Sequence, residues 1–328
     1  MIGIAMLSKW HVHADDYARQ IKESSEAEIT AVWDEDRERG VTWAKSLGVE
    51  FEPELDALLQ REDIDAVVVN APTNLHREVL TKAANAGKHI FTEKVLTSGI
   101  VEAQEVRTVV RKAGVKFCIS YPHKTMPHNL FAKKAVEENL LGEITLVRIR
   151  NAHGGSVAGW LPPHFYDKAA CGGGAMIDLG AHPMYLSRWL LGEPKRISSL
   201  FVHHYGKAVE DNGVCTIEYE NKAVAIVETG FITAKSPFAL ELYGTTGCLL
   251  VGGPDQRVKL CTETDGWTHP VLPEPADLPI VHWLKGIVRN ETILYDIDDA
   301  YTLTELMEAA YLSHMEKRIV EFKELGGQ

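Results

Sequence analysis

A strand–helix–strand pattern between residues 66 and 95 constrains the fold of this chain more than any other feature. Residues 66–69 are a short apolar run of the kind that is buried on both faces in a parallel sheet. The helix that follows has one apolar face, and residues 89–92 form a second short strand. The unit ends on Glu93-Lys94, at the carboxyl end of a strand, where open α/β sheets bind their ligands.

The same alternation of strands and helices runs through the first 120 residues of the chain. Short apolar segments are followed by segments with helical periodicity, and turn residues separate them. We predict further strands at residues 2–7, 28–33 and 115–120, and helices at residues 36–47, 55–59 and 98–113. Alternating strands and helices define a doubly wound parallel sheet.

Longer strands dominate the chain after residue 140. The runs that suit an antiparallel sheet are residues 145–151, 214–219, 223–230 and 239–243. Strands that cluster after an α/β half predict a second domain of the α+β class, with a large and mostly antiparallel sheet. We therefore place two domains at residues 1–122 and 123–328.

The chain is acidic, with 34 Lys and Arg against 46 Asp and Glu and a formal net charge of −12. Nucleic acids and anionic membranes bind surfaces with clustered Lys and Arg, so we expect neither as a partner. The amino terminus has no basic leader, and no apolar run is long enough to span a bilayer.

The five cysteines are far apart in the sequence and form no C-x-x-C pair. This spacing favours reduced thiols in a cytoplasmic protein over a disulfide framework. His11 and His13 have no second pair at metal-ligand spacing, so the sequence predicts no metal site.

Three segments of the chain carry a family resemblance. They read PTNLH, AGKHIFTEKV and GGGAMIDLGAH. These segments resemble the Gfo/Idh/MocA oxidoreductases, relatives of glucose-fructose oxidoreductase and inositol dehydrogenase, and the resemblance covers essentially the whole chain. It implies a Rossmann domain that binds NAD, with NADP possible, and a second domain for substrate binding and oligomerisation. It also implies a homodimer or a homotetramer.

The first turn departs from this family. The dinucleotide fingerprint G-x-G-x-x-G is expected after the first strand, but the chain has no glycine between Met6 and His13. Ser8, Lys9 and Trp10 stand there instead, and a hydroxyl and a cation are sensible partners for a pyrophosphate. The alternative is a tight surface turn with Trp10 packed for stability.

Asp34 ends the second strand at about the spacing expected for the acid that binds the adenosine ribose. Its carboxylate accepts hydrogen bonds from a 2'-hydroxyl and repels a 2'-phosphate, which favours NAD over NADP. Arg37 or Arg39 could compensate for that repulsion. The resemblance adds a nicotinamide-side loop to the cofactor site. The residues it assigns to the cofactor from this loop onward are Ala71, Pro72, Asn74, His76, Glu93 and Lys94.

The catalytic residues implied by the resemblance are Lys94, Asp178 and His182. Lys94 matches the lysine of the family's Glu-Lys-Pro motif, although Val95 replaces the proline. Asp178 and His182 match its D-x-x-x-H pattern and would face the same side of one helix. Tyr185 stands where the family frequently has an acid.

Further substrate contacts are expected around the start of the second domain. Tyr121, His123 and Lys124 follow the last strand of the parallel sheet, and the family often has an arginine near Lys124. Trp160 precedes the glycine run and could stack on a sugar ring, or it could equally belong to the core.

Together these features predict an NAD(P)-dependent dehydrogenase that acts on a secondary hydroxyl of a sugar, cyclitol or related polyol. His182 would be the proton acceptor or donor, Lys94 would polarise the oxygen, and Asp178 would orient the histidine; Lys94 and His182 can exchange roles. Two alternatives stay open. One is a non-catalytic ligand sensor on the same fold, which the glycine-free turn favours. The other is a redox-neutral glycosidase or epimerase that keeps its NAD bound.

Overall fold

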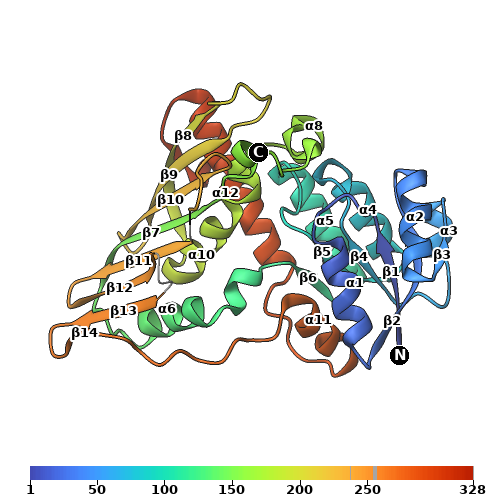
Figure 1. Ribbon diagram of the computed structural model, residues 1–328, viewed down its shortest axis with the longest axis horizontal. Coiled ribbons are helices and arrows are strands. Elements are labelled where there is room, and N and C mark those ends of the chain that lie inside the picture. Colours follow the sequence, from blue (N-terminus) through green and yellow to red (C-terminus); the bar gives the residue numbers. More distant parts are fainter. Residues whose placement is uncertain (237, 254–256, 328) are drawn as a thin grey trace. The chain divides into compact units, whose positions relative to one another are not determined.

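A six-stranded parallel sheet forms the first of two units in this computed structural model, which describes residues 1–236, 238–253 and 257–327 (Figure 1). The strand order is β3-β2-β1-β4-β5-β6, and every neighbouring pair is parallel. The strands are β1 (Ile2–Leu7), β2 (Ala27–Trp33), β3 (Glu50–Phe51), β4 (Ala66–Val69), β5 (His89–Thr92) and β6 (Phe117–Ile119). The predicted doubly wound sheet is confirmed.

Apolar runs explain the central position of these strands. All four residues of β4 and the last five of β1 are buried, as expected for strands covered on both faces. Connecting helices supply the cover with their own apolar sides. They are α1 (Ala14–Glu23), α2 (Arg37–Leu47), α3 (Leu55–Leu59), α4 (Thr73–Asn85) and α5 (Ile100–Ala113).

The first unit is assembled from two pieces of chain. It comprises Met1–Pro122 and Asp277–Thr304, although the sequence assigned residues 277–304 to the second domain. The returning piece contains α11 (Pro279–Val288), which packs against α1, β5 and β6. Trp283 of α11 is fully buried, and the Ile119 amide donates to the Tyr295 carbonyl at 2.9 Å.

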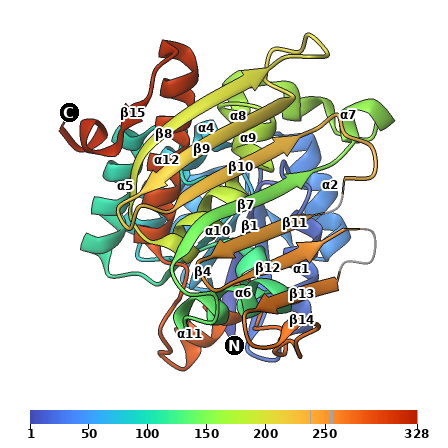
Figure 2. The same cartoon turned by 90° about the vertical axis from the view of Figure 1, so that its left-hand side faces the viewer.

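A nine-stranded sheet forms the second unit, which comprises His123–Ala276 and the residues from Glu305 onward (Figure 2). Its order is β14-β13-β12-β11-β7-β10-β9-β8-β15. Only β7 and β10 pair in parallel; the other pairs are antiparallel, as predicted. The strands are β7 (Ile144–Ala152), β8 (Pro194–Val202), β9 (Asn212–Tyr219), β10 (Val224–Gly230), β11 (Ala239–Gly244), β12 (Gly247–Gly252), β13 (Arg257–Thr262), β14 (Gly266–Thr268) and β15 (Val320–Glu321).

Helices cover one face of this sheet. The central one, α10 (Ala181–Leu191), packs on β7 and β10 and is almost entirely buried. The others are α6 (Pro127–Glu137), α7 (Gly155–Ala158), α8 (Lys168–Cys171) and α9 (Ala175–Asp178), with short 3-10 turns η1 (Pro122–Thr125), η2 (Pro163–Tyr166) and η3 (Phe322–Gly327). The long helix α12 (Ile297–Glu316) begins in the first unit and ends in the second. No helix among the described residues combines the length and the apolar composition needed to cross a membrane.

One sequence expectation about this unit is wrong. Asp178 and His182 were expected on one continuous helix, but α9 ends at Asp178 and α10 begins at Ala181. Gly180 lies in the break, where a Cβ atom would stand 2.4 Å from the Met176 carbonyl oxygen. The two residues therefore belong to different helices.

A buried carboxylate holds the glycine run that precedes α9. Glu210 Oε1 accepts the amides of Gly174 and Met176 at 2.9 Å each, and the Tyr311 hydroxyl at 2.7 Å. Gly174 approaches the Glu210 carbonyl so closely that an added Cβ would lie 2.1 Å from the oxygen. Burial and the adjacent Glu210 raise the pKa of the Tyr311 hydroxyl well above its usual value. The run is thus shaped by backbone contact with Glu210.

We predict that Glu210→Ala lowers the free energy of unfolding by about 3 kcal/mol, because three buried donors lose their acceptor. Tyr311→Phe removes only one of these hydrogen bonds and should cost about 1 kcal/mol. Urea unfolding of the two variants beside wild type measures the difference. Equal costs would show that the two backbone bonds contribute little.

Candidate functional site

The first turn keeps its shape without glycine by placing Ser8 in the left-handed region. Ser8 has φ of 70° and is fully buried. Its amide donates to the Trp33 carbonyl at 2.7 Å, and its hydroxyl accepts the Trp10 amide at 3.1 Å. A left-handed non-glycine residue costs about 1 kcal/mol, and these hydrogen bonds offset that cost. The Ser8 hydroxyl, predicted as a pyrophosphate contact, is therefore already hydrogen-bonded within the turn.

Asp34 connects the first turn to α2. Its Oδ2 atom accepts the Lys9 amide at 2.8 Å and Arg39 Nε at 3.0 Å, while Oδ1 accepts the Asp36 amide at 2.8 Å and Arg39 Nη2 at 2.6 Å. Asp34 is only 4% exposed. Partial burial lowers the pKa of Arg39, but Asp34 and Glu35 more than offset this and raise it above its usual value. The expected ribose-binding acid is thus paired with a cation.

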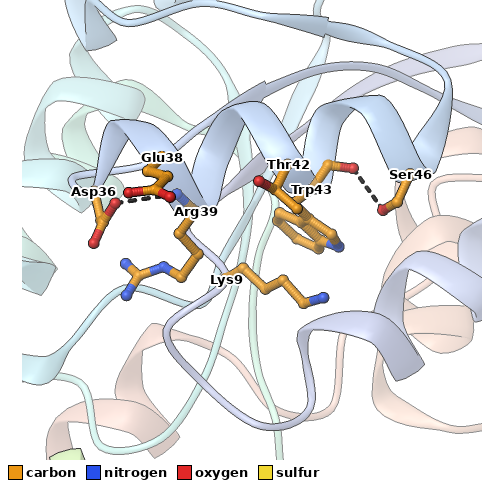
Figure 3. A pocket seen from close by; sticks show the side chains of 7 residues that line it. All are labelled: Lys9, Asp36, Glu38, Arg39, Thr42, Trp43 and Ser46. Atoms are coloured by element: carbon orange, nitrogen blue, oxygen red, sulfur yellow. Dashed lines mark hydrogen bonds between the residues drawn. The ribbon is translucent and has the colours of Figure 1, made fainter.

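A cavity of about 540 Å³ opens between the first turn and α2. Figure 3 shows Arg39 and Trp43 pointing from α2 toward Lys9. The Lys9 ammonium lies 3.1 Å from the Asp15 carboxylate and 5.9 Å from the centre of the Trp43 ring. The lining residues are Lys9, Asp36, Glu38, Arg39, Thr42, Trp43 and Ser46. The lining thus carries two cations, two carboxylates and two hydroxyls, a polar set that suits a hydroxyl-rich group.

A second polar cluster surrounds Glu93 at the carboxyl end of β5. Glu93 is 2% exposed, and its Oε1 atom accepts the Tyr17 hydroxyl and lies 2.9 Å from His13 Nδ1. His11 Nδ1 is 3.4 Å from the same oxygen. Burial raises the pKa of the Glu93 carboxyl, but His11, His13 and Lys94 outweigh it, so the pKa falls well below its usual range. Glu93 is therefore ionised at neutral pH.

The predicted nicotinamide-side loop is fixed through His76. Its Nε2 atom lies 2.9 Å from the Ala71 carbonyl, and Nδ1 lies 2.9 Å from the Val95 carbonyl and 3.1 Å from that of Leu96. Burial lowers the pKa of His76, and the hydrogen bonds to the Ala71, Leu96 and Val95 carbonyls oppose that shift. His76 thereby ties the start of α4 to the segment just after Lys94.

Lys94 itself is buried at the end of β5, with 7% of the residue exposed. Its amide donates to Glu93 Oε2 at 3.1 Å, and the Lys94–Val95 peptide bond is cis. Pro72 precedes the first residue of α4 and is buried, whereas Asn74 is exposed. Of the predicted cofactor residues, Ala71 and His76 thus share one hydrogen-bond network, Lys94 bonds to Glu93, and Asn74 is exposed on the surface.

In the second unit, His182 lies in a cluster of buried polar side chains. His182 Nδ1 is 2.9 Å from the Tyr185 hydroxyl, and the His123 amide donates to the same hydroxyl at 3.1 Å. The rings of His123 and His182 stack with centroids 4.3 Å apart. Lys124 is also buried, and its ammonium lies 6.0 Å from the Tyr185 ring centre and 5.8 Å from that of Trp189. The structure thus brings together His123, Lys124 and His182.

The other predicted substrate residues make different contacts. The Tyr121 side chain is buried in the first unit, and its hydroxyl donates to the Asp299 carbonyl at 3.0 Å. Trp160 is 58% exposed and packs against His153, with ring centroids 4.6 Å apart. Asp178 interacts electrostatically with His153. Burial lowers the pKa of His153, and the charge of Asp178 opposes this shift.

Two residues that matter to these clusters were not assigned from the sequence. Tyr17 was given no role, and Tyr185 was noted only as a departure from the family pattern. Arg39 was named as one of two arginines that could compensate for Asp34, and the structure selects it. The sequence contains a weak indication for Arg39. Asp36 is the N-cap of α2, and its side chain accepts the Arg39 amide, which places Arg39 in the first turn of that helix.

Comparison with known proteins assigns this geometry to a family. Residues 1–121 match the model described as the oxidoreductase family with an NAD-binding Rossmann fold, and residues 130–250 match the GFO/IDH/MocA C-terminal domain. The chain belongs to the GFO/IDH/MocA oxidoreductase family. This confirms the predicted family, the enzyme class of oxidoreductase and the NAD cofactor.

Several relatives are similar over most of their length. Inositol 2-dehydrogenase of Rhizobium meliloti (strain 1021) is 26% identical over 97% of each chain. The NAD(+)-dependent scyllo-inositol 2-dehydrogenase of Bacillus subtilis (strain 168) is 25% identical over 84% of each chain. A levoglucosan dehydrogenase, solved with NADH and levoglucosan, superimposes with a TM-score of 0.83 at 20% identity, covering 98% of each chain. This GFO/IDH/MocA member thus shares the fold of the levoglucosan dehydrogenase over nearly its whole length.

Proposed function

We propose that this protein is an NAD(P)-dependent dehydrogenase that oxidises or forms a secondary hydroxyl of a sugar, cyclitol or related polyol. The observation that carries the proposal is Lys94, a buried lysine at the carboxyl end of β5 in an NAD-binding sheet. Relatives named for action on inositols and levoglucosan support the substrate class. A panel of sugars and polyols, assayed with NAD⁺ and with NADP⁺, identifies the particular substrate.

The reaction needs a group that moves the hydroxyl proton and a group that stabilises the oxygen. NAD supplies the hydride acceptor when it is bound. His182 has the burial and the fixed ring orientation of an acid–base, because Tyr185 holds its Nδ1 atom. If Nδ1 donates to Tyr185, then Nε2 carries a lone pair and takes the proton. If Nδ1 accepts, then Nε2 carries the proton and Lys94 becomes the base.

Asp178 keeps a proposed role in tuning the site, although the hydrogen bond seen at His182 Nδ1 is made with Tyr185. Lys124, His123 and Trp160 are proposed substrate contacts, as is Tyr121. The aromatic and cationic surroundings of Lys124 suit the binding of a hydroxyl-rich ring.

We predict that Lys94→Met abolishes turnover while NADH still binds, because the lysine contacts the substrate oxygen. His182→Asn should lower kcat by about 100-fold or more. Lys112→Met is the matched control, since Lys112 is exposed in the last turn of α5. Wild-type rates in the first two variants would overturn the assignment.

A ligand sensor is the competing function, and the glycine-free first turn is the observation that favours it. An NADH titration followed by fluorescence separates the two. Absence of binding at millimolar NADH would reject the dehydrogenase and leave the sensor. A cofactor that copurifies and never exchanges would instead favour a redox-neutral glycosidase or epimerase.

We further propose that the adenosine end of the cofactor occupies the cavity beside α2. Asp34 was expected to select NAD over NADP by repelling a 2'-phosphate. The Arg39 guanidinium neutralises that charge from the cavity side, which weakens the discrimination. Lys9, also on the cavity wall, adds a second positive charge. Ser8 and Trp10 complete the turn on which the pyrophosphate would rest.

Arg39→Ala should therefore shift the ratio of kcat/KM for NAD to kcat/KM for NADP toward NAD by about tenfold or more, because one charge-assisted contact is worth about 1.5–3 kcal/mol. Arg37→Ala is the control, since Arg37 follows the same turn but does not line the cavity. An unchanged ratio in Arg39→Ala would show that Arg39 does not face the ribose.

The last part of the proposal concerns assembly and surroundings. The outer face of the nine-stranded sheet exposes Leu200, Val202 and Val214, and Leu200 and Val214 are cross-strand partners. Exposed apolar sheet faces commonly pack against another subunit, so we propose a homodimer or homotetramer. The acidic charge and the free thiols fit a cytoplasmic protein without nucleic-acid or membrane partners.

Light scattering at micromolar concentration tests the assembly. We expect a dimer or tetramer in wild type and a smaller species in Leu200→Asp, because a charge there opposes burial of the face. A wild-type monomer would reject this part of the proposal.

A further inference from the structure

We propose that His11, His13 and Glu93 form a binding site for one divalent transition-metal ion of the zinc class. The site lies entirely within the first unit, at the carboxyl ends of β1 and β5. The sequence shows only the His-x-His pair, and the fold supplies the third ligand from 80 residues away. This inference does not depend on the proposed dehydrogenase activity.

The ligand atoms are already close enough to share one ion. One nitrogen from each histidine and one Glu93 oxygen lie within 4.8 Å of one another. His11 Nδ1 and His13 Nδ1 are 3.4 and 2.9 Å from Glu93 Oε1. An ion with bonds of about 2.0–2.2 Å places neighbouring ligand atoms about 3.0–3.5 Å apart. These two separations are near that range, whereas the three atoms as a set lie only within 4.8 Å of one another, so an ion would draw the ligand atoms together and displace the His13 amide that donates to His11 Nδ1 at 3.3 Å.

Hydrogen bonds from neighbouring residues hold the Glu93 carboxylate in place, as is usual for carboxylates that bind metal ions. The Tyr17 hydroxyl donates to Glu93 Oε1, and the Ser120 hydroxyl lies 2.7 Å from the Tyr17 oxygen. The Glu93 Oε2 atom accepts the Lys94 amide at 3.1 Å. Such outer hydrogen bonds fix the orientation of a ligand before the ion arrives.

The burial pattern gives an ion both protection and an entry path. Glu93 and His11 are 2% and 6% exposed, whereas the His13 side chain is 42% exposed. Nearby, the carbonyl of Asn70 accepts the His11 amide at 3.1 Å, while both polar atoms of the buried Asn70 side chain have no hydrogen-bond partner among the described residues. Three protein ligands leave a position open for water or another oxygen ligand.

The ligand set selects the kind of ion. Two imidazoles and one carboxylate suit Zn²⁺, Co²⁺, Ni²⁺, Mn²⁺ or Fe²⁺, whereas Mg²⁺ and Ca²⁺ prefer sites made of oxygen alone. The competing interpretation is a hydrogen-bonded His–Glu–His cluster that binds protons rather than metal. The two differ in whether the cluster takes up Zn²⁺.

The test is equilibrium dialysis of tag-free full-length protein against micromolar Zn²⁺, with the bound metal measured by elemental analysis. We expect one equivalent in wild type, and affinity at least about tenfold weaker in His13→Ala and in Glu93→Gln. Bound Co²⁺ should give visible absorption bands that both variants lose. Circular dichroism and thermal unfolding of each variant show that the loss does not reflect misfolding.

Two controls address adventitious zinc, since the chain has 14 histidines and five cysteines. His203→Ala removes an exposed histidine of the second unit, and Cys248→Ser removes one of two thiols that face each other across β12 and β13. Both should bind zinc as wild type does. The proposal is overturned if wild type retains no zinc, if His13→Ala and Glu93→Gln bind as tightly as wild type, or if only a control loses the metal.

Discussion

The ionised Glu93 carboxylate is the contact on which the ligand-binding edge of the first unit depends. It is buried beside Tyr17 of α1, His11 and His13 of the first turn, and the Lys94 amide. A charge in so dry a place is stable only while its hydrogen-bond partners stay in position. The partners come from segments far apart in the sequence, so one side chain fixes the relative positions of β1, α1 and β5.

The first turn replaces bare backbone with side chains that hold one another. Ser8 adopts the backbone conformation usual for glycine, Asp34 accepts the Lys9 amide, and Arg39 satisfies the outer side of Asp34. A glycine-rich turn leaves its amides and its space to the ligand. Here part of the hydrogen-bonding capacity is used within the protein, and in the proposed cofactor site charged side chains at the cavity wall would attract the phosphate.

The parallel sheet and the second sheet were predictable because their signals are local. Each strand can be recognised from the apolar pattern of its own segment, as in the short run at residues 66–69 and in the longer strands after residue 140. The break between α9 and α10 was missed because helical spacing fits Asp178 and His182, and the close approach of Gly180 to the Met176 carbonyl is a detail of local backbone geometry that spacing does not show. Glu93 could not be joined to His11 and His13 from sequence alone, since only the sheet order shows that β4 alone separates β5 from β1.

Because residues 277–304 return to the first unit and the residues from 305 onward rejoin the second, the chain passes between the two units three times. The segment 1–122 alone would lack α11, and with it the buried Trp283 and the Tyr295 carbonyl that bonds to Ile119 at the edge of the sheet. A single crossover at residue 122 would therefore separate β6 from its cover. Exchange of the second unit between relatives, in evolution or in the laboratory, has to preserve all three of these junctions, the last of which falls within helix α12.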